Sequence, residues 1–148
     1  MPVNNRETFL SKEPVHFSVS QKVLFRHCDP AGIVFYPRMF EMVNDAIEAM
    51  FETLIGWPWQ EMHATHGGPT VAISARFAAV CRHGDVLDFN IMIQKLGNSS
   101  LTLLTHAVNR GELKFSVENT MVCVNKRGCA VSWPEPVREK IEQRMKAS

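Results

Sequence analysis

Asp29 is the residue of this chain whose surroundings point most directly to chemistry. It follows the strand-like run His16–Phe25, and a Pro-Ala-Gly bend then leads into a helix predicted to begin near Pro37. The first turn of a helix has backbone N–H groups without partners and the positive end of the helix dipole. Such amides stabilise a carbonyl oxygen that becomes negative, while a nearby carboxylate attacks or activates water. The segment therefore fits acyl transfer, although an Asp that only caps the helix fits the same pattern.

His27 and Cys28, the two residues before Asp29, are weaker candidates for catalysis. Neighbouring residues of an extended strand point to opposite faces, so a Cys28 nucleophile cannot use His27 as its base. We expect His27 to lie at the end of a strand and to face solvent or a partner subunit. The chain has four cysteines without a CxxC pair or metal-ligand spacing. We expect Cys81 and Cys123, which lie in apolar runs, to be buried thiols.

The length and composition predict a single soluble domain. A chain of 148 residues with 45% hydrophobic and 21% charged residues is typical of one globular domain, which we place at residues 15–148 after a flexible arm at 1–14. A net charge of +1 without a run of Lys and Arg gives no reason to expect a nucleic-acid partner. No apolar stretch is long enough for a membrane span, and no signal segment is recognisable, so we expect a cytoplasmic protein without a membrane partner.

The hydrophobic pattern predicts one long helix followed by several strands. Apolar residues recur at steps of three and four after Pro37, which predicts an amphipathic helix that ends at Gly56 and Pro58. Beyond Gly67 the pattern changes to strands with short connections, which favour antiparallel neighbours. The predicted strands are Thr70–Arg82, Val86–Leu96, Leu101–Asn109, Lys114–Asn125 and Cys129–Trp133, followed by a short surface helix at Glu135–Lys146. This order indicates the α+β class, with the long helix on one face of the sheet.

The segment Asp29–Pro37 resembles the signature of the 4-hydroxybenzoyl-CoA thioesterase branch of the hotdog-fold family. The likeness continues through the predicted helix, Gly56–Trp59 and the strand pattern of about residues 69–133. The resemblance implies a hotdog fold, in which a curved antiparallel β-sheet wraps around one long central α-helix. It also implies a homo-oligomer, either a dimer or a tetramer, with each site formed across two chains.

The resemblance gives several residues a role in hydrolysing an acyl-CoA substrate. Asp29 matches the family's catalytic acid, as a nucleophile or as a general base for water. The backbone N–H of Tyr36 matches the oxyanion donor. Gly32 lets the backbone approach the substrate or is a plain turn glycine. The implied chemistry needs no metal and no cofactor, since coenzyme A is part of the substrate.

Asn44 marks a difference from the 4-hydroxybenzoyl-CoA enzymes. It shares the apolar stripe of the predicted helix with Phe40 and Val43, so we expect it to point inward. The matching position in those relatives is a carboxylate that receives the phenol hydroxyl. An amide here favours an unsubstituted or differently substituted aromatic acyl group, or a short aliphatic one.

A second difference concerns the residues that bind coenzyme A. The predicted hairpin at residues 95–100 occupies the place where relatives carry a basic cluster for the nucleotide phosphates, but Lys95 is its only charged residue. The candidates for substrate binding at this turn are Lys95, Asn98, Ser99 and Ser100. Alternative phosphate partners elsewhere are Arg76, Arg82, Arg110, Lys126 and Arg127. His63 and His66 fall in a Gly-rich loop and are further candidates for substrate contact.

Two other functions are compatible with the same fold. A hotdog domain can bind acyl-CoA without hydrolysing it, as a sensor or a carrier partner, although a pure binder gains little from the Asp29 carboxylate. A hotdog dehydratase would need a His and an acid inside the helix, and this pair has no clear match in the chain.

Overall fold

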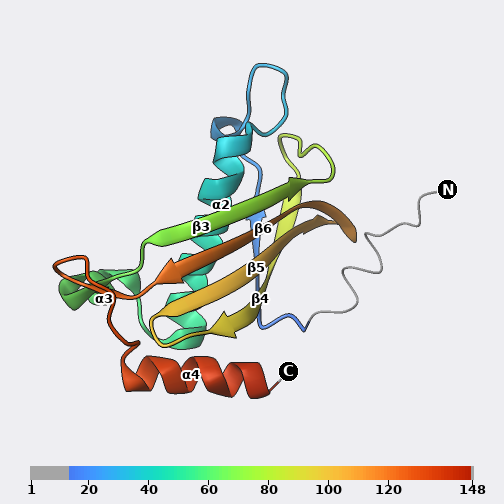
Figure 1. Cartoon of the computed structure of the whole chain (residues 1–148). Coiled ribbons are helices and arrows are strands. Elements are labelled where there is room, and N and C mark those ends of the chain that lie inside the picture. The colour runs from blue at the N-terminus through green and yellow to red at the C-terminus, as the bar shows by residue number, and fades with distance from the viewer. Residues whose placement is uncertain (1–13, 148) are drawn as a thin grey trace.

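A five-stranded antiparallel sheet and one long helix form the body of the structure, a computed structural model that describes residues 14–147. The sheet order is β1-β4-β5-β6-β3, and helix α2 (Tyr36–Met50) lies across one face of the curved sheet (Figure 1). The strands of the sheet are β1 (Phe17–Lys22), β3 (Thr70–Phe77), β4 (Val86–Leu96), β5 (Ser100–Asn109) and β6 (Glu112–Val122). The predicted α+β arrangement is confirmed, whereas the predicted arm lies outside the described residues apart from Pro14.

Helix α2 buries the apolar stripe that its sequence spacing predicts. Its first turn contains Pro37, where the missing N–H of proline costs no hydrogen bond. After Met50 the chain continues as a π-helical turn, η2 (Phe51–Ile55), and ends at Gly56, which has a left-handed φ of 77°. The predicted helix from Pro37 to Gly56 is thus confirmed, with a π-helical end that the periodicity does not reveal. Among residues 14–147, no helix has the length and apolar character required to cross a membrane.

The predicted strands vary in how closely they match the structure. The prediction is correct for β4 and within one residue for β5. The run Lys114–Asn125 divides into β6 and the short β7 (Val124–Asn125). The predicted strand Cys129–Trp133 is wrong, because this segment makes a single bridge to β7 and then turns toward the C-terminal helix.

The prediction of a loop around His63 is also wrong. Helix α3 (Trp59–Thr65) occupies this region, and it is followed by β2 (His66–Gly67), which pairs with β7. A helix of seven residues with one buried apolar side chain, Met62, is too short to produce a clear periodic signal.

The core lies between α2 and the sheet. Its largest fully buried side chains include Phe51, Phe89 and Phe115. Cys81 and Cys123 are fully buried as predicted, and burial raises the pKa of the Cys81 thiol to about 11, so it stays protonated at neutral pH. The C-terminal helix α4 (Glu135–Lys146) confirms the predicted tail helix and contacts η2, at the end of α2 opposite Tyr36 (Figure 1).

Candidate functional site

Asp29 lies in a tight loop that the backbone closes on itself. Cys28 and Val34 form an antiparallel bridge, and the Asp29 N–H donates to the carbonyl oxygen of Ile33 at 2.9 Å. Gly32, at the bend, has a φ of 80°, a conformation that side chains disfavour. This backbone requirement accounts for the glycine, and its approach to a substrate stays a prediction.

Asp29 is half-buried, and one hydrogen bond orients its carboxylate. Its Oδ1 accepts a hydrogen bond from the Ala31 N–H at 2.8 Å, while Oδ2 has no partner among residues 14–147. Asp29 does not cap helix α2, because the N-cap position belongs to Phe35. The alternative interpretation of Asp29 as a helix cap is therefore wrong, and one carboxylate oxygen stays available for chemistry.

The start of α2 lies at the end of the same loop. The Phe35 N–H donates to the carbonyl oxygen of His27 at 3.0 Å, which fixes the entry of the helix against the segment before Asp29. The N-cap residue gives no side-chain hydrogen bond, and the first turn has no acidic residue. Within the described part of the chain, the Tyr36 N–H has no acceptor. An uncapped helix start of this kind favours a negative oxygen supplied by a ligand.

His27 is a structural residue and not a solvent-facing side chain. It is 2% exposed, and its Nδ1 accepts a hydrogen bond from the Leu24 N–H at 2.9 Å. Burial lowers the pKa of His27, so the ring is neutral at neutral pH. The predicted exposed position is wrong because residues 25–27 form a 3₁₀ turn, which directs this side chain into the interior.

Aromatic rings surround the start of α2. The Tyr36 ring lies 5.5 Å from the Phe35 ring, 6.4 Å from the Phe40 ring and 6.3 Å from the Phe77 ring, measured between centroids. Tyr36 is 58% exposed and Phe77 is 52% exposed, so the rings form an apolar wall that faces outward. Sequence reasoning missed Phe77 because its partners belong to a helix far away in the chain.

Asn44 is exposed, and the prediction that it points inward is wrong. The buried stripe of α2 contains Val43 and Ile47, and one residue step turns the helix by about 100°, which places Asn44 beyond the edge of the stripe. Its side chain instead borders a hollow of about 250 Å³, which we call the α2–α3 hollow. The residues that line it are Asn44, Trp59, Met62, His63, Gly68, Pro69, Thr70 and Met121.

The turn between β4 and β5 lies far from Asp29 within one chain. The 20 residues Tyr36–Ile55 span roughly 30 Å along the helix axis. The turn lies beside α4, at the other end of that span (Figure 1). The structure therefore does not bring Lys95, Asn98, Ser99 or Ser100 to Asp29 of the same chain.

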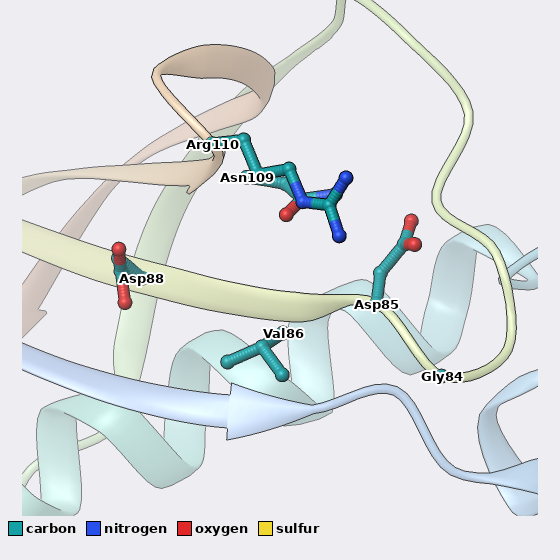
Figure 2. A pocket seen from close by; sticks show the side chains of 6 residues that line it. All are labelled: Gly84, Asp85, Val86, Asp88, Asn109 and Arg110. Carbon is teal, nitrogen blue, oxygen red and sulfur yellow. The ribbon is translucent and has the colours of Figure 1, made fainter.

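A polar hollow of about 460 Å³ lies where β4 begins and where β5 ends in the turn to β6. Figure 2 shows the Arg110 guanidinium and the Asp85 carboxylate extending into the same space, with Asp88 farther along the strand. Two carboxylates beside one guanidinium disfavour a phosphate, so Arg110 is a poor phosphate partner here. No group of three or more His, Cys, Asp and Glu side chains in residues 14–147 is arranged to hold a metal ion.

Comparison with known proteins identifies the family. The sequence profile described as the thioesterase-like superfamily matches residues 23–141. A 4-hydroxybenzoyl-CoA thioesterase from Pseudomonas sp. (strain CBS-3) is 28% identical over 96 residues, which are 63% of this chain and 67% of the relative.

Solved structures agree with this match. A gentisyl-coenzyme A thioesterase superposes with a TM-score of 0.76 and 28% identity, over 82% of this chain and 99% of that one. A 1,4-dihydroxy-2-naphthoyl-CoA thioesterase from Synechocystis, 20% identical, shares the fold with a TM-score of 0.79, over 84% of this chain and 94% of that one. The hotdog fold predicted from the resemblance is confirmed. This chain belongs to the thioesterase-like superfamily and is a thioester hydrolase.

Proposed function

We propose that this protein hydrolyses an aromatic acyl-CoA to the free acid and coenzyme A. The observation that carries the proposal is the loop from Asp29 to Tyr36, in which an oriented carboxylate and an uncapped helix start belong to one folded segment. The relatives at 28% identity support the acyl class, because both are named for hydroxylated aromatic acyl-CoA substrates.

Asp29 and Tyr36 divide the proposed chemistry between them. Asp29 either attacks the thioester carbonyl, giving an anhydride that water then opens, or takes a proton from the attacking water. In both routes the carbonyl oxygen becomes negative and accepts a hydrogen bond from the Tyr36 N–H. The thiolate of coenzyme A then leaves, and no cofactor takes part.

The α2–α3 hollow is the proposed place for the acyl group. Met62, Pro69 and Met121 give it apolar walls, while the Asn44 amide and His63 add polar groups at its border. An aromatic ring with a small polar substituent fits this mixture. Asn44 offers both a donor and an acceptor without a charge, which distinguishes it from the carboxylate of the 4-hydroxybenzoyl-CoA enzymes.

Strand β3 supports the proposal that two chains form the site. It is the last strand of the sheet and, within residues 14–147, pairs only with β6. On this open edge Val71 is 61% exposed and Ile73 is 54% exposed, which is unusual for apolar residues of a sheet without a partner. Pairing of β3 with β3 of a second chain about a two-fold axis covers these side chains.

Two-fold symmetry also explains why residues far apart within one chain can serve one substrate. In such a pair the two α2 helices run antiparallel, so that the β4–β5 turn of one chain approaches the Asp29 loop of its partner. We therefore propose a homodimer as the smallest active unit, with Lys95, Asn98, Ser99 and Ser100 of one chain serving Asp29 of the other.

Thiol release from a panel of acyl-CoA esters tests the proposed function. The panel contains benzoyl-, 4-hydroxybenzoyl-, 2,5-dihydroxybenzoyl-, acetyl- and butyryl-CoA, with the Asp29→Asn variant as the matched control. We expect kcat/KM for the best aromatic ester to exceed that of the aliphatic esters by about tenfold or more. A preference for butyryl-CoA would refute the aromatic class. Release no faster than that of the Asp29→Asn variant, together with measurable acyl-CoA binding, would indicate a binding domain instead.

A further inference from the structure

We call the turn between β4 and β5 the 97–100 turn (Gly97–Ser100). All of its carbonyl oxygens accept hydrogen bonds from other groups of the protein. Four successive carbonyl groups accept hydrogen bonds from residues that follow β6 or belong to its end. The donors are Arg138 Nη2 to Gly97 O and Asn98 O, Trp133 N to Asn98 O, Cys123 N to Ser99 O, and Trp133 Nε1 to Ser100 O. Ser100 O also accepts from the Gly97 N–H within the turn. The oxygen atoms of this turn therefore face the protein.

Arg138 is the charged member of this set of donors. One of its nitrogen atoms, Nη2, lies 2.6 Å from Gly97 O and 3.0 Å from Asn98 O, and Nη1 lies 3.5 Å from Glu142. The side chain is 21% exposed, and it extends from α4, which is anchored by the buried Val137 and Ile141. A fixed guanidinium that spans two adjacent carbonyls holds the turn in one conformation.

The same turn has backbone donors that are not used. The N–H groups of Asn98 and Ser99 have no acceptor in the described part of the chain. The turn is closely packed, since a Cβ on Gly97 would collide with Ser100 Oγ. Unpaired backbone N–H groups, in a turn whose carbonyl groups are already bound and which has a cation behind it, can form a site for an oxyanion.

We propose that Arg138 is a positioning residue for coenzyme A, which keeps the 97–100 turn in the conformation that binds the phosphates of the nucleotide. This inference rests on the proposed function, because that function supplies coenzyme A as the ligand. Arg138, which belongs to α4, thereby provides the positive charge that the turn itself lacks. Its loss lets the carbonyl groups of Gly97 and Asn98 turn outward, where their negative ends repel phosphate.

The dissociation constant for coenzyme A, measured by titration calorimetry, tests the proposal directly. We expect Arg138→Ala to weaken binding by about tenfold or more, because a hydrogen-bonded charge is removed. Arg138→Lys keeps the charge but loses the planar fork, so its affinity lies between those of the wild type and Arg138→Ala. The control is Arg144→Ala, since Arg144 is an exposed cation on the same helix. Dephospho-coenzyme A and inorganic phosphate show which phosphate the turn binds.

Kinetics separate positioning from a general loss of structure. Arg138→Ala should raise KM for the best acyl-CoA by about tenfold and change kcat by less than about twofold. The same acyl group on N-acetylcysteamine has no phosphate, so wild type and Arg138→Ala should hydrolyse it equally fast. Equal affinity of the two proteins for coenzyme A would overturn the proposal, as would an equal loss of activity toward both thioesters. Tight binding of coenzyme A through Arg138 without thiol release would instead refute the proposed function and leave this inference standing.

Discussion

The two ends of helix α2 differ in how their polar groups are satisfied. At the start, the Tyr36 N–H and one oxygen of Asp29 have no partner within residues 14–147, and apolar rings around them are half exposed. At the far end, Gly56 closes η2, and the carbonyl groups of the 97–100 turn are bound by Arg138 and Trp133. Polar groups in folded proteins are normally paired, so the open end is the one that a ligand completes.

This comparison assigns the reacting groups to the start of α2 and the groups that bind coenzyme A to its far end. The open end holds the groups that would react with a thioester, and the closed end holds a turn whose shape is set by side chains behind it. Substitutions at the open end should therefore change turnover, whereas substitutions at the closed end should change affinity.

The largest effect is expected from Asp29→Asn. Asn keeps the size of the side chain and can still accept the hydrogen bond from the Ala31 N–H, so the loop should keep its conformation. Without the carboxylate, kcat should fall by about 1,000-fold or more, while KM changes much less. Steady-state thiol release checks this, and a variant that kept a tenth of wild-type turnover would exclude Asp29 as the catalytic group.

Replacement of Tyr36 tests the role of its backbone N–H. Tyr36→Pro removes this donor at a helix position that tolerates proline, and the extended conformation of Phe35, with ψ of 128°, suits a residue before proline. Turnover should fall by roughly 100- to 1,000-fold, the usual loss for one oxyanion donor. Tyr36→Ala, which keeps the N–H, is the matched control and should retain most of the activity. Equal losses in the two variants would show that the ring matters and the N–H does not.

Mixed dimers show whether the two ends act across chains. Asp29→Asn and Arg138→Ala chains, co-expressed with different tags and purified through both, form dimers that carry one defect in each chain. If Asp29 serves together with the partner's turn, one of the two sites is intact, and turnover at low substrate should be about half that of the wild type. If both ends acted within one chain, neither site would be intact. The mixed dimer would then be no more active than the more active of the two single-variant proteins.

Asn44→Asp tests how the α2–α3 hollow selects the acyl group. A carboxylate at this position should accept a phenol hydroxyl, so we expect the ratio of kcat/KM for 4-hydroxybenzoyl-CoA over benzoyl-CoA to rise by about tenfold. Gln143→Glu on the surface of α4 adds the same charge away from the hollow and should leave the ratio unchanged. A change within about twofold would assign Asn44 no part in selectivity.

The smallest effect concerns stability in mild acid. Burial lowers the pKa of both His27 and His106 below 6.5, so the unfolded chain binds more protons than the folded chain as the pH drops below that value. The free energy of unfolding should therefore decrease with falling pH below 6.5 and stay level from there to about pH 8, below the range in which thiols of the unfolded chain ionise. His27→Asn, which can still accept from the Leu24 N–H, should reduce this decrease. Urea unfolding of the variant and the wild type at several pH values measures the effect, and equal pH profiles for the two proteins would contradict the assignment.

The parts of the fold that depend on local signals were predictable from the sequence. Turn residues bracket β4 and β5, and amphipathic spacing marks α2 and α4, so these elements match within a residue or two. Helix α3 and the irregular segment Cys129–Trp133 escaped prediction because contacts with distant residues decide their conformation. Neither leaves a periodic pattern.

The candidate site was predictable in its motif and not in its surroundings. The positions of Asp29 and Tyr36 follow from one continuous segment, and their roles stay predictions. The burial of His27, the exposure of Asn44 and the place of Phe77 beside Tyr36 follow from packing between elements that are far apart in the chain. The hydrogen bonds from Arg138 to the 97–100 turn join residues about 40 positions apart and have no local signature.

The open edge of β3 has a consequence for how much of this protein is active at a given abundance. If activity requires that two such edges meet, the fraction of competent molecules follows mass action and falls when the protein is diluted below its dimer dissociation constant. Specific activity should then rise with enzyme concentration and level off, with a lag after rapid dilution as pairs separate. An edge that carries Val71 and Ile73 is also prone to pair with the wrong strands. The same contact would thus supply catalytic competence and protection from aggregation, so that a chain without a partner lacks both.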